Sequence, residues 1–169
     1  MRKTTTLVGA GLLTVATASG AVAAATVATV ASTTKDVVVS STSNKSLGTT
    51  GGTRTVIASA AFPAGSWVLT LHATMVNFGP SDYGRCELYQ GATAIAGATA
   101  TVGDPAQAGN RGPASLVSTL SLAYGVTLAA PTTMSVQCSH DSTNGSTPYV
   151  DASASLVAHK SPALLDLFQ

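Results

Sequence analysis

The sequence predicts an all-β protein, an antiparallel β-sandwich of jelly-roll type with about eight to ten short strands. Only 9% of the residues are charged, against roughly 25% in ordinary soluble domains. Alanine, valine, threonine, serine and glycine take their place, and small or β-branched residues suit pleated, half-buried sheets. From residue 53 onward, apolar and polar residues alternate with period two between turn signals. The 169 residues suffice for one domain with a core.

Residues 1–31 have the build of a signal peptide and leader. Arg2 and Lys3 form a basic start, an uncharged stretch follows, and Ala21, Val22 and Ala23 offer a small-residue cleavage site near residue 23. The alternative is an uncleaved membrane anchor, since about 20 apolar residues can span a bilayer. Interruption of the apolar stretch by threonine and serine favours cleavage. We therefore expect a secreted, extracellular protein that has no membrane contact once the signal is removed.

Residues 32–52 form a Ser/Thr-rich lead-in, in which the valines at 37–39 suggest one edge strand. The β-sandwich domain is expected at 53–160. Its clearest strand is 66–78, where one parity is apolar and the other is polar. A tight turn at 63–65 joins this strand to a strand at 55–62, and we expect the two to form a hairpin. The apolar parity comprises Trp67, Leu69, Leu71, Ala73 and Met75.

The second half of the domain repeats this pattern. Strands are expected at 82–89 and 92–102, and the longest loop follows at 103–113. The alternating segment 116–128 is expected to break into two strands near Gly125. A strand at 132–140, a polar loop at 141–148 and a closing strand at 149–159 complete the domain. An apolar tail, 161–169, is too short to hold a helix alone, so it is either frayed or docked.

The two cysteines, Cys86 and Cys138, are expected to form a disulfide. Secretion places both thiols in an oxidising compartment, where an even cysteine count usually means pairing. Cys86 also alternates in phase with Leu88, and Cys138 with Met134 and Val136, so both face the core. The alternative is a pair of buried free thiols that act as small apolar side chains.

Three features of the chain form a recognisable pattern: the turn that launches a long strand at 62–68, residues 126–131 leading into the strand 132–138, and the closing strand at 149–159. This pattern resembles the C1q/TNF-like jelly-roll superfamily. The resemblance covers roughly residues 53–160 and implies a non-catalytic binding module that assembles as a homotrimer. It transfers no functional residue. The signal and the Ala/Thr/Val-rich composition also resemble those of secreted actinobacterial proteins.

Candidate ligand-contact residues lie in the two longest loops of the domain. Asp104 and Arg111 belong to the loop 103–113, and His140 and Asp141 open the loop that follows the strand 132–140. Loops at strand ends are where sites are usually built. A histidine beside an aspartate is the smallest part of an acid–base site, yet it lacks the further partners that catalysis requires.

No catalytic, metal or cofactor signature emerges from the sequence. The serines lack the G-x-S-x-G setting of a hydrolase nucleophile, and the loop aspartates lack calcium-loop spacing. Loss of Arg2 and Lys3 with the signal leaves six basic and seven acidic side chains. The basic residues are scattered singly, which argues against nucleic-acid binding because that requires clustered Lys or Arg.

We therefore expect a secreted non-catalytic binding or surface-structural module, not an enzyme, with an extracellular ligand that the sequence does not identify. The loops at 103–113 and 139–148 would contact it. The alternative is a small secreted hydrolase that uses His140 and nearby carboxylates. Titratable groups that converge in a cleft would favour the hydrolase, and an exposed loop surface would favour the binding module.

Overall fold

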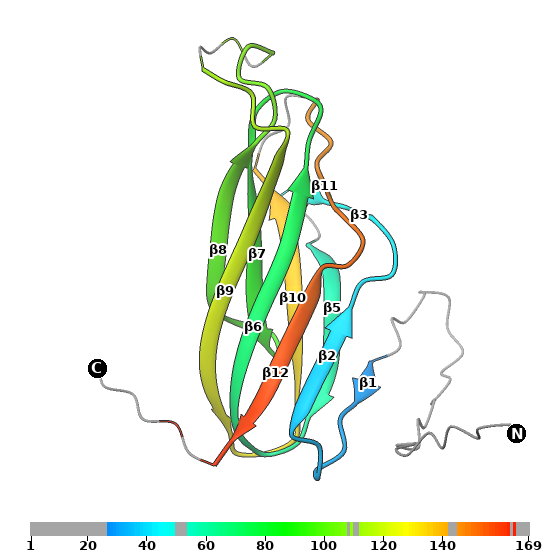
Figure 1. The fold of residues 1–169 in the computed structure, drawn as a ribbon, viewed down its shortest axis with the longest axis vertical. Helices are drawn as coiled ribbons and strands as arrows, with labels where there is room; N and C mark the ends of the chain where they lie inside the picture. The colour runs from blue at the N-terminus through cyan, green and yellow to red at the C-terminus, as the bar shows by residue number, and fades with distance from the viewer. Residues whose placement is uncertain are drawn as a thin grey trace, which may run out of the picture.

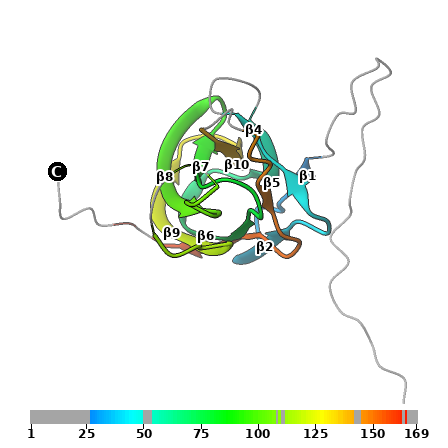
Figure 2. The ribbon, with the colours of Figure 1, turned by 90° about the horizontal axis from the view of Figure 1, so that it is seen from above.

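The computed structural model describes residues 27–49, 54–107, 109, 112–141, 145–162 and 164. In these residues two β-sheets face each other and form a sandwich (Figures 1 and 2). The predicted all-β sandwich is therefore confirmed. Across the described part of the chain, no helix is long and apolar enough to cross a membrane.

Each sheet contains six strands, and eight of all the described strands have five residues or more. Sheet A has the order β1 (Ala28–Thr29), β5 (Thr55–Phe62), β10 (Thr132–His140), β7 (Asp82–Gln90) and β8 (Thr93–Val102), and β4 (Gly48–Thr49) also pairs with β10. Sheet B has the order β2 (Asp36–Ser40), β12 (Ser155–Ser161), β6 (Gly65–Val76), β11 (Tyr149–Val150) and β3 (Lys45–Ser46), and β9 (Val117–Leu128) pairs with the other edge of β6.

The core lies between the inward faces of the two sheets. Along β6, all five members of the predicted apolar parity are at most 1% exposed, so the predicted register is confirmed. On sheet A, β10 places Met134, Val136 and Cys138 inward, and β7 places Cys86 and Leu88 inward. Because every second residue of these strands meets the opposite sheet, burial of the apolar parity drives the packing.

Alanines line the inward face of β8, at the edge where the sheets meet. Ala96, Ala98 and Ala100 are partly buried against the core, and the views along and across the molecule show β8 beside β9 (Figures 1 and 2). Larger side chains would hold the two edges apart. The small residues that the sequence concentrates in 92–102 therefore allow the sandwich to close on this side.

The predicted hairpin of residues 55–62 and 66–78 is wrong, because the two strands lie in different sheets. β5 pairs with β10 and β1, whereas β6 pairs with β9, β12 and β11. The turn between them crosses from one sheet to the other. The indole Nε1 of Trp67 donates to the carbonyl of Pro63 at 3.1 Å, and the ring meets Phe62 edge-on at 5.1 Å. These core contacts across the turn replace hairpin pairing.

Two further strand boundaries differ from the sequence analysis. The expected break near Gly125 is absent, since β9 runs unbroken along β6 through the pair Gly125 and Val68. The expected closing strand is instead interrupted between β11 and β12, although both pieces pair with β6. Ser153 adopts a positive φ of 76° there, and its amide donates to the backbone carbonyl of Ser41 at 3.0 Å. The turn is therefore tied to the Ser/Thr-rich lead-in at Ser41, whose own amide donates to the carbonyl of Ala154 at 2.8 Å.

The sandwich also extends beyond the predicted start at residue 53. The expected edge strand is confirmed as β2, which pairs along the whole of its length with β12. Further along the lead-in, β3 joins sheet B and β4 joins sheet A. The proposed signal, its cleavage site and most of the tail lie outside the described residues.

Gly84 provides a first test of the packing. It faces inward on β7, and a Cβ atom there would lie 2.0 Å from the sulfur of Met75, which is fully buried on the opposite sheet. Gly84→Ala should lower the free energy of unfolding by about 1 to 3 kcal/mol, because overpacking forces a buried side chain to move. Urea unfolding would measure this. Met75→Ala should relieve the clash, so the double variant should be more stable than the summed single effects predict. Strict additivity would contradict the contact.

Candidate functional site

Three loops meet at one end of the sandwich, and Asn77 joins them. This side chain is 1% exposed and follows β6 directly. Its amide nitrogen donates to the carbonyls of Pro80 and Val102 at 2.8 and 3.2 Å and to the hydroxyl of Ser146 at 2.8 Å. Its side-chain oxygen accepts from the Gly79 amide at 3.0 Å. One amide therefore fixes the loop after β6, the end of β8 and the loop before β11, all at the upper end in Figure 1.

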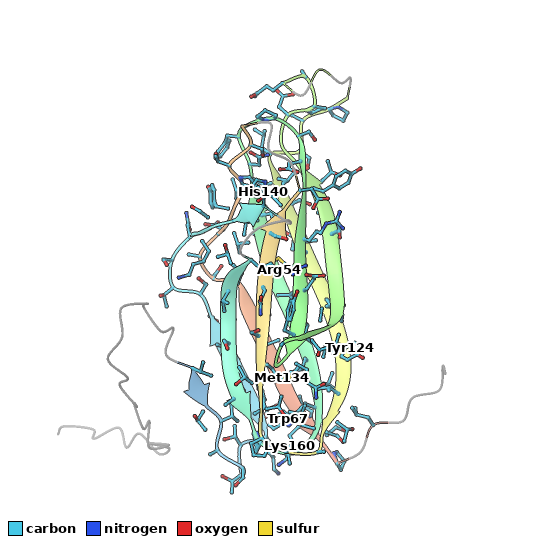
Figure 3. The ribbon with its side chains drawn as sticks, turned by 180° about the vertical axis from the view of Figure 1, so that it is seen from behind. Arg54, Trp67, Tyr124, Met134, His140 and Lys160 are labelled. Carbon is cyan, nitrogen blue, oxygen red and sulfur yellow. A yellow bond between two sulfur atoms is a disulfide. The ribbon has the colours of Figure 1, made fainter. Side chains whose placement is uncertain are left out.

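Asp82 and His140 form a polar pair at the same end of the core. The Nδ1 atom of His140 lies 2.7 Å from Oδ2 of Asp82, and the side chains are 6% and 1% exposed. The second carboxylate oxygen accepts from the Tyr83 amide at 2.7 Å. His140 continues the inward parity of β10, and its position towards the loop end is visible in Figure 3. A carboxylate held against Nδ1 orients an imidazole ring, but burial leaves this ring little contact with solvent.

Asp141 points to the opposite side of the sheet. It forms a paired hydrogen bond with the guanidinium of Arg85, whose Nε donates to Oδ1 at 2.8 Å and whose Nη2 donates to Oδ2. The carboxylate raises the pKa of Arg85, first through this hydrogen bond and then through its charge. The sequence placed His140 and Asp141 in one candidate site. The structure turns them apart, because successive residues of an extended chain face opposite sides.

The sequence analysis missed Asp82, although two signals pointed to it. It shares the inward parity of Cys86 on one strand, as His140 shares that of Cys138 on another. Cys86 lies opposite Cys138 in the antiparallel register, which sets Gly84 opposite His140. Asp82 is then the diagonal neighbour of His140 on the same face. The disulfide together with the period of two thus implies the pair.

The remaining predicted contact residues belong to the loop after β8. Asp104 accepts from the Ala106 amide at 2.9 Å and from the side chain of Gln107 at 3.3 Å, so its carboxylate shapes its own loop. Its backbone amide donates to Gly79 at 3.0 Å, which ties this loop to the loop after β6. Arg111 lies outside the described residues. Asp104 thus shares one end of the sandwich with His140 and Asp141.

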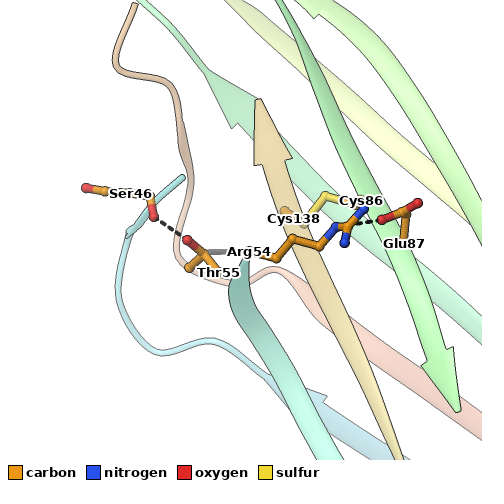
Figure 4. The surroundings of a disulfide bond; sticks show 6 residues. All are labelled: Ser46, Arg54, Thr55, Cys86, Glu87 and Cys138. Carbon is orange, nitrogen blue, oxygen red and sulfur yellow. Dashed lines mark hydrogen bonds and ion pairs between the residues drawn. A yellow bond between two sulfur atoms is a disulfide. The ribbon is translucent and has the colours of Figure 1, made fainter. Parts of the chain in front are cut away.

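The expected disulfide between Cys86 and Cys138 is confirmed, with both residues fully buried. It joins neighbouring strands of sheet A at a Cα–Cα distance of 4.1 Å. On the outer face beside it, Arg54 extends to Glu87, with Nε and Oε2 2.9 Å apart (Figure 4). Burial raises the pKa of Tyr89, and its hydrogen bond to Glu87 adds to this. This polar cluster covers the middle of the sheet and lies away from the loops.

Exposed apolar side chains surround the loop end. Phe78 is 65% exposed and Val117 is 55% exposed. The amide of Asn77 donates to the carbonyl of Leu116 at 2.9 Å, so Phe78 and Leu116 belong to neighbouring segments. Tyr83, near the start of β7, is 54% exposed. We call Phe78, Tyr83, Leu116 and Val117 the loop-end cluster. Val117 lies on the outer face of sheet B and Tyr83 on that of sheet A, so the cluster is an exposed apolar rim around the loops.

Solved structures of viral chains support the jelly-roll fold. No protein-family model matches the chain, and no curated protein matches it in sequence. The structure of infectious bursal disease virus Gx strain has a TM-score of 0.51 at 13% identity, over 89% of this chain and 38% of that chain. The VP2 subviral particle of that virus gives 0.50 at 13%, over 88% and 38%. Eiger TNF from S. frugiperda gives 0.49 at 8%, over 80% and 99%.

The viral chains are similar to this protein in fold alone. This protein spans 38% of their length. The chain is an antiparallel sandwich of jelly-roll type. Among the residues that the structure describes, no group of three or more His, Cys, Asp or Glu side chains could hold a metal ion. The candidate site is therefore the loop end, with its buried polar base and its exposed apolar rim.

The buried Asp82–His140 pair at the loop end should be important for stability. Asp82→Ala removes a partner of a buried histidine and should lower the free energy of unfolding by roughly 3 kcal/mol. Arg85→Ala is the matched control, because it breaks a pair whose side chains are 40% and 29% exposed, and it should cost much less stability than Asp82→Ala because solvent screens the pair. Chemical denaturation would compare the two. Equal losses of unfolding free energy in the two variants would mean that the buried Asp82–His140 pair contributes no more to stability than the exposed Arg85–Asp141 pair.

Proposed function

We propose that this protein is a secreted, non-catalytic binding or surface-structural module whose loop end contacts an extracellular partner. The observation that carries the proposal is that the exposed loop-end cluster surrounds loops held in place by hydrogen bonds from Asn77. Four large apolar side chains, at least 37% exposed, surround loops that Asn77 holds in place. A preorganised surface loses less conformational entropy on binding than a mobile one.

The arrangement of the polar groups favours binding over hydrolysis. The alternative hydrolase would use His140 with nearby carboxylates. His140 is paired with Asp82 inside the core, and Asp141 is paired with Arg85 on the outer face. A general base must come within hydrogen-bond reach of the proton that it takes. At 5% exposure, His140 offers substrates little access.

Binding to intact cells of the secreting strain would test the proposal. The labelled mature protein should bind saturably, and Phe78→Ser/Val117→Ser should lose at least about tenfold in affinity, as expected for the centre of an interface. Val38→Ser/Val56→Ser is the matched control, since these valines are 66% and 42% exposed on strands away from the loop end. Equal binding by both variants, or no saturable binding, would contradict the proposal.

A screen with chromogenic esters, peptides and glycosides tests the alternative. The proposed module should turn over none of them. Hydrolysis that disappears in a folded His140→Ala variant would establish the enzyme instead. Secretion, signal removal and assembly into a homotrimer stay predictions of the sequence.

A further inference from the structure

β9 is a long edge strand without the usual protection against pairing with other chains. Natural proteins keep edge strands short, charged or bulged, because an open edge pairs with further strands. Among the described strands, the other sheet edges follow this rule. β1, β3 and β4 have two residues each, β2 has five residues and carries Asp36, and the pairing of β8 with β7 contains a register shift.

The sequence of β9 suits pairing on both sides of the strand. Its twelve residues include no charged residue and no proline, and its register along β6 is unbroken. An edge strand directs the N–H and C=O groups of every second residue away from its partner. In the part of the chain that the structure describes, no strand pairs with this second edge of β9. β9 therefore offers a row of backbone donors and acceptors to an additional strand.

Part of this edge is accessible beyond the facing sheet. β8 lies beside the upper part of β9, and β9 continues below it towards its C-terminal end (Figure 1). Tyr124 shares the inward parity of Leu120, which is 3% exposed, yet Tyr124 is 37% exposed. The facing sheet therefore leaves β9 uncovered at Tyr124. On the outer face, a Cβ atom at Gly125 would lie 3.2 Å from a methyl carbon of Leu164, so the outer positions before Gly125 are the better sites for probes.

The composition of β9 favours a second copy of the same strand as the added partner. Two identical strands related by a two-fold axis pair in antiparallel fashion, so each residue meets a residue of the same sequence segment. Charged residues on such a strand would bring like charges together, which is destabilising. β9 brings none. Its outward threonines and serine can also hydrogen-bond across strands.

We propose that two copies of this protein form a dimer through antiparallel pairing of their β9 strands, which joins two six-stranded B sheets into one continuous sheet. A two-fold contact uses one edge of each copy and closes at the dimer, so it differs from the predicted homotrimer. Because the paired strands run in opposite directions, the two loop ends point away from each other. The dimer thereby presents two separate contact surfaces. The proposal does not depend on the loop-end function.

Lysines on the edge strand test the dimer. Light scattering of the purified protein should give twice the mass of one chain at high concentration. Thr119→Lys/Ala123→Lys should weaken the dimer at least about tenfold, because lysines on an edge block strand addition. Thr70→Lys/Thr74→Lys is the matched control, since these residues are the register partners of Ala123 and Thr119 on β6, which has backbone partners on both sides. The control should dimerise like the wild type, and dilute samples of both variants should keep its melting temperature.

Cysteine cross-linking locates the pairing independently. Thr119→Cys, Ser121→Cys and Ala123→Cys are oxidised mildly, alone and in pairwise mixtures. Directly opposite residues of an antiparallel pair have Cα atoms about 5 Å apart, and a slip of two residues adds about 7 Å along the strand. The combinations that belong to one register should therefore give at least about fivefold more disulfide-linked dimer than the others. Thr70→Cys, inside the sheet, should give no more than the unmatched combinations.

Three results would overturn the β9 dimer. The mass of a single chain over a wide concentration range would show that the copies do not associate. A trimer, or association that survives Thr119→Lys/Ala123→Lys and is lost in Thr70→Lys/Thr74→Lys, would assign the contact to the outer face of sheet B. Equal cross-linking at all positions, Thr70 included, would mean that the β9 strands have no common register.

Discussion

Cys86→Ala/Cys138→Ala is expected to lower the free energy of unfolding by about 4 kcal/mol. The bridge spans a sequence separation of 52 residues, and the chain-entropy model gives that loss for a loop of this length. Both sulfur atoms are buried between strands that pair directly in sheet A. Because the total free energy of unfolding of small domains is about 5 to 15 kcal/mol, this variant should unfold at a much lower denaturant concentration.

Reduction provides the control for this variant. A reducing agent should destabilise the wild type and leave the double variant unchanged, since the variant has no bridge to lose. Thiol titration of the denatured, unreduced wild type should find no free thiol. Two titratable thiols would contradict the bridge, and a dimer on a non-reducing gel would move it between chains.

Leu120→Asp is expected to cost at least about 4 kcal/mol and to leave little folded protein. Leu120 is 3% exposed and faces the core from β9. Its transfer from water contributes about 1.5 to 3 kcal/mol, and a buried carboxylate without a partner adds a further penalty of several kcal/mol. Thermal unfolding by circular dichroism would measure the loss.

Ser121→Asp tests the same strand on its other side. Ser121 is exposed, and it lies opposite His72 on β6. An aspartate there remains in water, so the change in unfolding free energy should stay within about 0.5 kcal/mol. Equal losses for the two variants would mean that β9 has the opposite register.

The stability and the proposed activity depend on different parts of the molecule. The disulfide and Leu120 lie in the sandwich core, whereas the loop-end cluster is exposed and should tolerate substitution. Variants at Phe78 and Val117 should therefore fold normally and fail only in binding. Asn77 connects the two parts, since its side chain satisfies three loop groups from inside the fold.

The position of the candidate site followed only in part from the sequence. Loops at 103–113 and 139–148 were expected to carry contacts, and the structure brings their described residues to one end of the sandwich. The partner of His140 was taken to be its neighbour in the chain, whereas the structure supplies Asp82, 58 residues away. A site across two strands depends on their pairing, and strand pairing is a long-range property.

By itself, the sequence determined the fold class, the inward parity of β6 and β10, and the pairing of the two cysteines. These are local or compositional properties, because a period of two and an oxidising compartment need no knowledge of which strands are neighbours. Only the tertiary structure decided that β5 and β6 lie in different sheets, that His140 meets Asp82, and that Leu164 lies against Gly125. Each of these contacts joins segments through the packing of two sheets. Short turns of similar sequence can serve either a hairpin or a crossing between sheets, and the core contacts of Trp67 and Phe62 select the crossing here.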